Sequence, residues 1–449
     1  MTPDLIDKYS SPVPRYTSYP TTPHFDAAIG NDTYRAWLAA LPAEATLSLY
    51  LHIPFCDRLC WFCGCHTKQT HRYAPVARYL GALGHEIAAV AGALDGRGRV
   101  TAIHLGGGSP TLLSPDDLRH LAGMLGQAFP VADTVEFSVE IDPNDMNAAK
   151  IDALAEIGIT RASLGVQDFD PRVQAAINRI QSFADTRAVV DALRARGVGS
   201  VNLDLLYGLP FQTVETLLAS VDQVISLRPE RIALFGYAHV PWMKKHQTQI
   251  ADDTLPDVYQ RFEQAQAAAE RIVAAGYERI GLDHFALPGD ALARAARQGR
   301  LRRNFQGYTV DEADALLGFG ASSIGKLPQG YVQNTVATGM YEQQVEKDGV
   351  AVARGFALRP SDRVRSYAIE RLMCGLGFTP AELRARFGAD AEPVIREARL
   401  VAGFDWNGFV SMDERGFRVT EAGRPFVRTV AAAFDAYLGQ GAARHSVAV

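Results

Sequence analysis

The sequence lacks several features that would place a protein in a large functional class. It contains no run of about 18 apolar residues, so we expect no membrane-spanning helix. Neither sign of charge dominates, because 45 Lys and Arg residues stand against 50 Asp and Glu residues, for a net charge of −5. Without a basic stripe, we expect no nucleic-acid partner. The first residues lack the basic and apolar parts of a secretion signal, and we therefore expect a cytoplasmic protein.

Cysteine is scarce, and its distribution is the most informative feature of the chain. Of the five cysteines, four lie within ten residues, at Cys56, Cys60, Cys63 and Cys65. A Cys-x3-Cys-x2-Cys spacing brings three thiolates together on one loop, and thiolates favour soft metals and iron–sulfur clusters. Three ligands on a four-iron cluster leave one iron open to a further molecule, as in open catalytic metal sites. The spacing therefore predicts a reactive iron–sulfur centre.

Two other uses of these cysteines compete with an iron–sulfur cluster. A zinc site would need a second ligand pair, and the fifth cysteine, Cys374, stands alone more than 300 residues away. Zinc held by all four clustered cysteines is an alternative, although Cys63 and Cys65 are too close in sequence to serve easily as two ligands of one tetrahedron. A disulfide framework does not suit a cytoplasmic chain. Cys374 itself is predicted to be a small buried apolar residue.

Apolar periodicity predicts an α/β domain in the first three quarters of the 449-residue chain. Short β-rich runs alternate with helical patterns long enough to cross back over a sheet. Six βα units in series imply parallel strands with right-handed crossovers, curled into a partial (β/α)6 barrel. The predicted strands cover residues 48–55, 101–105, 134–141, 161–166, 200–207 and 231–237, and the intervening helices cover residues 76–94, 116–128, 148–156, 172–196 and 214–227.

The unusual residues follow the predicted strands, at the carboxyl ends where reactive groups gather in such barrels. The cysteine loop follows the first strand, and Gly106, Gly107 and Gly108 follow the second. Three glycines allow bare backbone to approach a ligand such as a cationic amino group. A tight strand-to-helix turn would require the same residues. We expect one face of the barrel to carry the site.

The composition changes near residue 355 and predicts a smaller second domain. Helical patterns at residues 363–374, 380–387 and 391–402 precede strands at 408–412 and 417–420 and a last helix at 423–438, an order that resembles a winged-helix module. At the other end, residues 9–20 carry three prolines and three tyrosines without periodicity, which indicates an extended arm. We therefore expect an N-terminal arm and lid (1–40), a barrel domain (41–350) and a mostly α-helical, winged-helix-like domain (351–449).

These motifs together resemble a known family. The three-cysteine loop after a first strand and the glycine-rich turn after the second resemble the radical S-adenosylmethionine superfamily. More narrowly, the chain is similar to the oxygen-independent coproporphyrinogen III oxidase family from about Tyr9 into the C-terminal domain. The resemblance is carried in order by residues 14–20, 52–56, 63–65, 165–169, 204–210, 237–239, 283–285 and 303–308.

The resemblance implies a set of cofactor ligands. Cys56, Cys60 and Cys63 would hold a [4Fe-4S] cluster, whose fourth iron would bind the amino and carboxylate groups of S-adenosylmethionine, while Cys65 would not be a ligand. The family holds two S-adenosylmethionine molecules. The first would be lined by Tyr50, Gly107, Glu140, Ala238 and Ile324, and the second by Phe62, Gly108, Ser109, Gln167, Arg179 and Asp204. Ser109 departs from the threonine usual in the family but keeps a hydroxyl group. Taken singly, a polar residue such as Asp204 at a strand end could equally cap the next helix.

The resemblance also implies a reaction and its partners. The family decarboxylates the ring A and B propionates of coproporphyrinogen III to the vinyl groups of protoporphyrinogen IX, without oxygen, in haem biosynthesis. It implies a tetrapyrrole substrate, a low-potential electron donor such as flavodoxin or ferredoxin, and a monomer. Basic residues beside the family-like segments, Arg15, Arg300, Arg302 and Arg303, are candidates for binding propionates. An ordinary solvated charge cluster is an equal interpretation for Arg300 and Arg302.

Two further function classes compete with this interpretation. A haem-binding chaperone of the same superfamily would keep the ligand cysteines and the barrel, but such relatives generally lack the continuation to Cys65 and the arm at residues 14–20. A nucleic-acid-binding redox sensor would use the cluster and the winged module together. It predicts salt-dependent DNA affinity, which the acidic composition disfavours.

Overall fold

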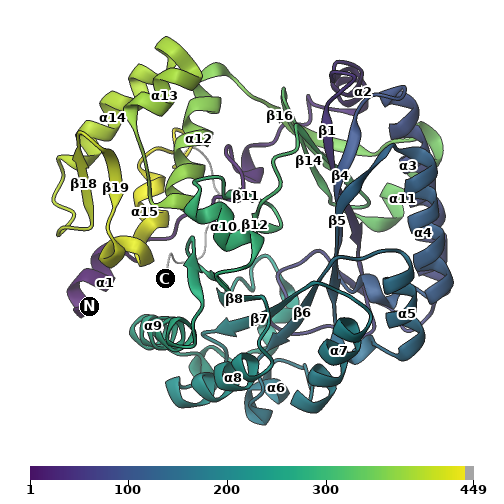
Figure 1. Ribbon diagram of the computed structural model, residues 1–449, viewed down its shortest axis with the longest axis horizontal. Helices are drawn as coiled ribbons and strands as arrows, with labels where there is room; N and C mark the ends of the chain where they lie inside the picture. Colours follow the sequence, from purple (N-terminus) through teal and green to yellow (C-terminus); the bar gives the residue numbers. More distant parts are fainter. Residues whose placement is uncertain (440–449) are drawn as a thin grey trace.

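The computed structural model describes residues 1–439, and Figure 1 shows a curved sheet wrapped by helices with a smaller module beside it. The sheet and the helices of its outer face are formed by β1 (Thr46–Ile53), α3 (Ala74–Leu94), β4 (Arg99–Gly107), α4 (Pro115–Ala128), β5 (Val131–Ile141), α5 (Ala148–Glu156), β6 (Arg161–Gln167), α6 (Pro171–Ala176), α7 (Phe183–Ala195), β7 (Ser200–Tyr207), α8 (Val214–Ser226), β8 (Arg231–Gly236) and α9 (Val258–Ala274). These elements confirm the predicted partial barrel. Along residues 1–439, no helix is both long and apolar enough to cross a membrane.

The sheet has the strand order β16-β15-β14-β13-β1-β4-β5-β6-β7-β8-β10-β9, with neighbouring strands parallel from β13 to β8. Sequence patterns predicted β1 and β4 to β8. They missed β13 (Ala315–Phe319), β14 (Ile324–Leu327), β15 (Gly330–Asn334) and β16 (Val352–Ala357), which extend the sheet on the other side of β1. Two further short strands extend the sheet beyond β8: β10 (His284–Ala286) pairs with β8, and β9 (Glu278–Ile280) pairs with β10.

The alternation of side chains along the strands decides what faces the interior of the barrel. On β1, Leu49 and Leu51 are fully buried against the helical layer, so the intervening Tyr50 and His52 point the other way. On β7, Leu203 is likewise buried, and its neighbour Asp204 is only partly so. One face of each strand therefore forms the core, and the other lines a polar interior.

The predicted helix at residues 172–196 is two helices. α6 ends at Ala176, and Asn178 adopts a left-handed backbone conformation with a φ of 54°. The chain then turns, and the Ser182 side chain accepts a hydrogen bond from the Asp185 backbone to cap α7. The break is important because it carries Arg179 toward the cysteine loop.

The C-terminal module contains α12 (Pro360–Gly375), β17 (Gly377–Phe378), α13 (Pro380–Phe387), α14 (Glu392–Ala402), β18 (Val410–Asp413), β19 (Gly416–Val419) and α15 (Val427–Ala432). The order of helices and strands follows the prediction with two differences: the short strand β17 was not predicted, and the last helix is shorter than the predicted 423–438. A 3-10 turn at Glu421–Phe426 contains Pro425 and occupies the predicted start of that helix. The final ten residues of the expected domain lie outside the described part of the chain.

The N-terminal arm begins with a helix, α1 (Pro3–Tyr9), which lies beside the C-terminal module (Figure 1). The Tyr9 ring stacks on Trp406 with ring centroids 5.6 Å apart. The side chains of three later residues of the arm, Val13, Tyr16 and Tyr19, pack in the apolar core of the same module. The arm thus crosses the C-terminal module before the chain enters the barrel through α2 (Asn31–Ala39).

Candidate active site at the carboxyl ends of the strands

The cysteine loop starts where β1 ends, as predicted, and a distant segment holds it in place. The Lys244 ammonium donates a hydrogen bond to the backbone carbonyl of Cys65 (2.9 Å), and His246 Nε2 donates to that of Cys63 (2.7 Å). Gln247, which is fully buried, donates to the carbonyls of both Phe62 and Ala238 (3.0 and 3.2 Å). Sequence reasoning missed this segment, because its role depends on backbone contacts with a loop 180 residues away.

The thiol groups of the loop interact with one another. Burial, followed by the charges of Cys63 and Cys60, raises the pKa of the Cys56 thiol, and a hydrogen bond from Cys65 lowers the pKa of Cys63. Thiolate anions at these positions would repel one another, and the positive charge of the irons of a cluster would offset that repulsion. In the described part of the chain, no three His, Cys, Asp or Glu side chains gather tightly enough for a single metal ion. Cysteine thiolates on one short loop are the donor type that iron–sulfur clusters use, with one thiolate per iron.

The glycine-rich turn, formed by Gly106 and Gly107 at the end of β4 and by Gly108 after it, packs directly against the start of the cysteine loop. Gly107 has a φ of 114°, and a Cβ atom there would lie 2.6 Å from the His52 ring. A Cβ atom on Gly108 would lie 2.6 Å from the backbone oxygen of Phe55. The glycines therefore satisfy a tight approach between neighbouring strand ends, and they also leave the backbone of the turn open toward the site.

Glu140, at the end of β5, is held against this turn. Its carboxylate accepts a hydrogen bond from the Gly107 backbone N–H (2.9 Å) and another from His104 Nε2 (3.2 Å). Burial opposes ionisation, but the hydrogen bond and charge of His104, with the Gly107 N–H, outweigh it and leave the pKa of Glu140 below its usual value. A carboxylate beside an open turn is suited to accept hydrogen bonds from an ammonium group or ribose hydroxyls.

Tyr50 and Ile324 belong to the same region. The Tyr50 hydroxyl lies 2.9 Å from His52 Nδ1, and because His52 Nε2 donates to the carbonyl of His66, Nδ1 of the neutral ring accepts this bond. Tyr50 pairs in register with Gly318 of β13, where a Cβ atom would touch the backbone of Ile324. The expected ligands of the first cofactor that come from β1, β4, β5 and β14 are thus neighbours in space.

The residues expected to bind the second cofactor differ from one another in their hydrogen-bond partners and backbone conformations. Arg179 donates from Nη1 to Asp142 (2.9 Å) and to the Cys60 sulfur (3.6 Å), and its buried Nε has no partner within residues 1–439. Gln167 adopts a left-handed φ of 68° at the end of β6, a strained conformation of the kind found at functional sites. The Ser109 hydroxyl, in contrast, already has a partner, because it donates a hydrogen bond to the Asp145 carboxylate at 2.5 Å.

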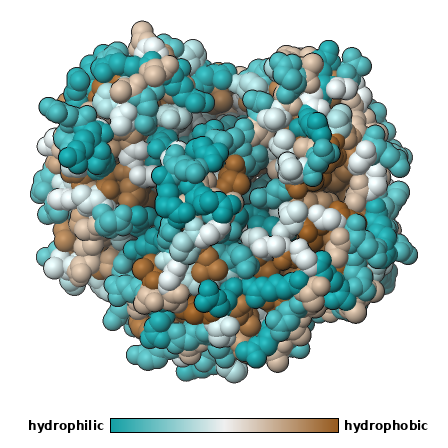
Figure 2. All heavy atoms as spheres, in the orientation of Figure 1, coloured by the Kyte–Doolittle hydropathy of each residue, from teal (hydrophilic) through white to brown (hydrophobic). Residues whose placement is uncertain are grey.

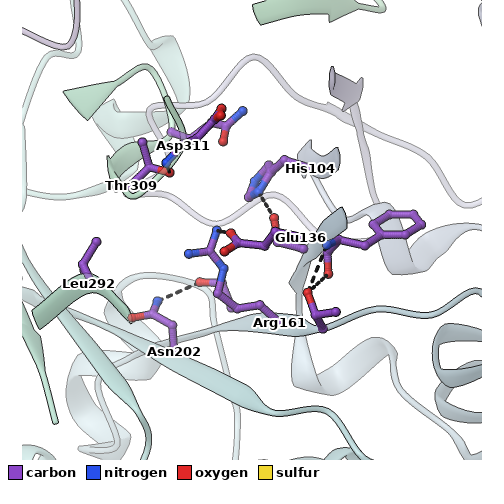
Figure 3. A network of polar contacts seen from close by, with 12 residues as sticks. His104, Glu136, Arg161, Asn202, Leu292, Thr309 and Asp311 are labelled. Atoms are coloured by element: carbon purple, nitrogen blue, oxygen red, sulfur yellow. Dashed lines mark hydrogen bonds and ion pairs between the residues drawn. The ribbon is translucent and has the colours of Figure 1, made fainter. Parts of the chain in front are cut away.

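Asp204 lines a polar cavity of about 140 Å³ inside the barrel together with Glu140. Figure 3 shows Arg161 and Asn202 in this interior, with Arg161 paired to Glu136 at 3.0 Å. Burial raises the pKa of Asp204 to about 6, and the charge of Glu140 adds to the effect against the hydrogen bond from Asn202. Two carboxylates attributed by resemblance to different cofactors therefore share one cavity.

A larger cavity, of about 330 Å³, opens between the barrel and the C-terminal module, within the range of small-molecule sites. It is lined by the ends of β7 and β8, by Ala238, and by six arginines: Arg15, Arg261, Arg279, Arg303, Arg424 and Arg428. On the face drawn in Figure 2, apolar patches are scattered among hydrophilic residues. The whole chain has a net charge of −5, so the concentration of positive charge in this cavity is a local property.

The structure divides the four arginines predicted to bind propionates into two pairs, one inside the cavity and one outside it. Arg15 and Arg303 line the cavity. Arg300 and Arg302 do not line it, and they lie 3.7 Å from the carboxylates of Glu312 and Glu370 respectively. The solvated-cluster interpretation therefore fits these two residues. The remaining four arginines were missed, since nothing local distinguishes Arg261 on an amphipathic helix from a surface residue.

Comparisons with known proteins agree with this geometry. Residues 50–224 match the radical SAM superfamily, and residues 358–426 match the HemN C-terminal domain. The chain is 48% identical, over 99% of its length and 98% of the relative's, to an oxygen-independent coproporphyrinogen III oxidase of Paracoccus denitrificans. A relative of the same name in Bradyrhizobium diazoefficiens is 48% identical over the full length of both chains. The solved structure of coproporphyrinogen III oxidase from Escherichia coli, described as a radical SAM enzyme, superposes with a TM-score of 0.90 at 37% identity, covering 94% of this chain and 97% of that one.

Proposed function

This chain belongs to the oxygen-independent coproporphyrinogen III oxidase family, and we propose that its cysteine loop and its arginine-lined cavity are the two parts of one active site. The enzyme converts the propionates on rings A and B of coproporphyrinogen III to vinyl groups in haem biosynthesis. The observation that carries the proposal is the position of Ala238. It is tied through Gln247 to the cysteine loop and also lines the cavity. A substrate in the cavity would therefore lie next to the cofactors.

The enzyme uses a [4Fe-4S] cluster and S-adenosylmethionine, which when bound supply the radical chemistry that removes a hydrogen atom from each propionate. Cys56, Cys60 and Cys63 would hold the cluster, and Cys65 would stay free of iron. Glu140 and the open turn at Gly107 would accept hydrogen bonds from the first S-adenosylmethionine. Tyr50, Ala238 and Ile324 would enclose it.

A second S-adenosylmethionine molecule remains part of the proposal. Phe62, Gly108, Gln167, Arg179 and Asp204 would line it, with the Arg179 guanidinium beside its carboxylate. The unpartnered Nε of Arg179 supports this role. The Ser109 hydroxyl would contact this molecule only after it leaves the Asp145 carboxylate. Measuring the ratio of bound S-adenosylmethionine to protein, with Arg179→Gln as the variant, tests for the second molecule.

The electron donor would approach beside the cysteine loop. Five cations belong to this loop or to the segment that holds it: Arg58, Lys68, Arg72, Lys244 and Lys245. Within residues 1–439, none of the five forms an ion pair with a carboxylate. Such a basic surface attracts an acidic electron-transfer protein such as flavodoxin or ferredoxin, and faster reduction at low salt would support it.

The remaining expectations extend the same proposal. We infer that the chain is divided into three units: the arm at residues 1–40, the barrel at 41–350 and the C-terminal domain at 351–449. We also infer that the protein is a monomer and that it lies in the cytoplasm. A reducing compartment suits clustered thiols. The packing of Tyr9 and Tyr16 on the C-terminal module supports an arm that works with that module as a lid.

The experiment that tests the function is anaerobic incubation of the reconstituted protein with coproporphyrinogen III, S-adenosylmethionine and a low-potential reductant. We expect protoporphyrinogen to accumulate together with methionine and 5′-deoxyadenosine. Cleavage of the cofactor without a vinyl product would contradict the substrate. Stable haem binding without decarboxylation would indicate a chaperone of the same superfamily instead.

A further inference from the structure

A carboxylate is buried on α3, the helix that follows the cysteine loop. Glu86 is only 1% exposed, and its carboxylate accepts hydrogen bonds from three uncharged groups: the Gly320 backbone N–H (2.7 Å), the Asn334 side-chain amide (2.6 Å) and the Tyr341 hydroxyl (2.7 Å). Burial raises the pKa of Glu86 to about 7, and the hydrogen bonds from these groups act in the opposite direction. A carboxylate among neutral groups is costly to bury, but a fully hydrogen-bonded network fixes the segments that it joins.

The three donors to Glu86 come from separate elements. Gly320 begins the turn between β13 and β14, Asn334 ends β15, and Tyr341 lies on α11 (Thr338–Asp348), which packs beside α3 (Figure 1). The Asn334 amide also donates to the Gly320 carbonyl (3.0 Å). The buried network therefore holds both the N–H and the C=O group of Gly320.

The turn at residues 320–323 has an uncommon backbone conformation. Gly320 has a φ of 93° and Ser322 a φ of 64°, in the left-handed region that residues with a side chain rarely adopt. A Cβ atom on Gly320 would lie 2.6 Å from the carbonyl oxygen of His52. Such a conformation persists only where surrounding contacts hold it. The network of Glu86 supplies these contacts directly before β14 starts at Ile324.

The hydroxyl group of Tyr79, also on α3, joins the same turn to the end of β1. This buried hydroxyl accepts a hydrogen bond from the Ala321 N–H (2.8 Å) and donates one to the His52 carbonyl (2.8 Å). The His52 ring in turn accepts the hydrogen bond of the Tyr50 hydroxyl (2.9 Å). A shift of the turn would therefore move Ile324 directly and Tyr50 through His52.

We propose that Glu86 and Tyr79 are positioning residues of the first S-adenosylmethionine site, which hold the turn at residues 320–323 so that Ile324 and Tyr50 enclose the cofactor. This inference rests on the proposed function. Both residues belong to α3, in the helical layer on the outer face of the sheet, so they act on the cofactor through the residues that line its site. Loss of their hydrogen bonds should weaken cofactor binding while the cysteine loop still assembles the cluster.

The test is a titration of the anaerobically reconstituted, reduced protein with S-adenosylhomocysteine, followed by the electron paramagnetic resonance spectrum of the cluster. This probe keeps the amino acid and ribose groups of the cofactor but has no sulfonium to cleave. A molecule bound at the open iron changes the spectrum, so the titration reports on the first site. Tyr79→Phe should raise the dissociation constant about fivefold or more, because it leaves the Ala321 N–H and the His52 carbonyl without their partner.

Substitutions of Glu86 extend the same test. Glu86→Ala should weaken binding at least as much as Tyr79→Phe, and Glu86→Gln, which keeps one acceptor oxygen, should recover part of the affinity. In Tyr79→Phe, the KM for S-adenosylmethionine should rise while kcat stays within about twofold of wild type, because the reacting groups are unchanged. Iron content should match that of the wild-type protein.

The matched control is Tyr34→Phe, which removes another buried hydroxyl group near Glu86. Burial, followed by the charge of Glu86, raises the pKa of Tyr34, and its hydroxyl oxygen has no hydrogen-bond partner within residues 1–439. This variant should bind the probe like the wild-type protein. Wild-type affinity in Tyr79→Phe, equal losses in Tyr79→Phe and Tyr34→Phe, or a loss of iron that accounts for the weaker binding would each overturn the inference.

The inference and the proposed function can fail separately. If the affinities follow expectation but the wild-type protein makes no vinyl product, the proposed function fails and the positioning role stands. If the wild-type protein makes the product but Tyr79→Phe and Glu86→Ala bind the probe normally, the proposed function stands and the positioning role is rejected.

Discussion

At the scale of single residues, the site depends on side chains whose surroundings set their chemistry. Cys63 and Cys65 are separated by one glycine, yet the structure gives them different surroundings: Cys63 is partly buried in the loop, and Cys65 is exposed. Lys244 holds the backbone of Cys65 and not its thiol. The backbone of the loop therefore keeps its shape when the Cys65 side chain is shortened.

This difference predicts unequal effects of removing one thiol. Cys60→Ala should abolish stable cluster assembly, because each of three irons needs its thiolate. Cys65→Ala should assemble nearly the wild-type amount of iron. The measurement is iron and sulfide content with the visible absorbance after anaerobic reconstitution. Equal iron loss in the two variants would show that Cys65 is a ligand.

The raised pKa of Asp204 predicts that the free energy of unfolding depends on pH. Its pKa is raised from about 4 in the unfolded chain to about 6 by burial. The folded protein therefore binds more protons than the unfolded chain between these values, and the contribution of Asp204 to stability falls as pH rises from about 4 to 6. Asp204→Asn should raise the free energy of unfolding at pH 7 by about 1–2 kcal/mol relative to its effect at pH 4. Denaturant unfolding at both pH values measures this, and a pH-independent difference would contradict it.

At the scale of elements, the strand ends place the site, and the sequence predicted them well. The six βα units, the cysteine loop and the glycine turn follow from local periodicity and spacing. The strands β13 to β16 could not be predicted from local periodicity, because they are short and contain glycines such as Gly318 and Gly330. The break before Arg179 and the arginines of the cavity also escaped prediction. Each depends on a contact between segments far apart in the sequence, which periodicity cannot register.

The glycine-rich turn at the end of β4 gives a prediction with a control inside the same fold. Gly107→Ala places a Cβ atom on a left-handed residue and 2.6 Å from the His52 ring. The free energy of unfolding should fall by about 2 kcal/mol or more. Gly123→Ala, on α4 with nothing within 4 Å of the added carbon, should stabilise the helix slightly. Chemical denaturation of both variants measures their free energies of unfolding. Similar changes in the two variants would show that the close approach of Gly107 to His52 does not contribute to stability.

At the scale of the whole molecule, the composition gives a poor guide to the electrostatics of the site. The net charge of −5 excludes a basic surface over the whole chain. Folding nevertheless brings arginines from the arm, the barrel and the C-terminal module into one cavity. The concentration of positive charge in the cavity is therefore a property of the fold and not of the composition.

The arm connects these parts, and its removal is the clearest test of that arrangement. Deletion of residues 1–20 removes Tyr9, Val13, Tyr16 and Tyr19 from the core of the C-terminal module and Arg15 from the cavity. Turnover should fall at least tenfold and the melting temperature should decrease, while iron content stays near wild type because the cysteine loop lies on the barrel. Arg15→Gln in the full-length chain separates the two effects: it should weaken substrate binding without lowering the melting temperature. Full activity of the deletion variant would reject the arm both as a lid and as a part of the substrate site.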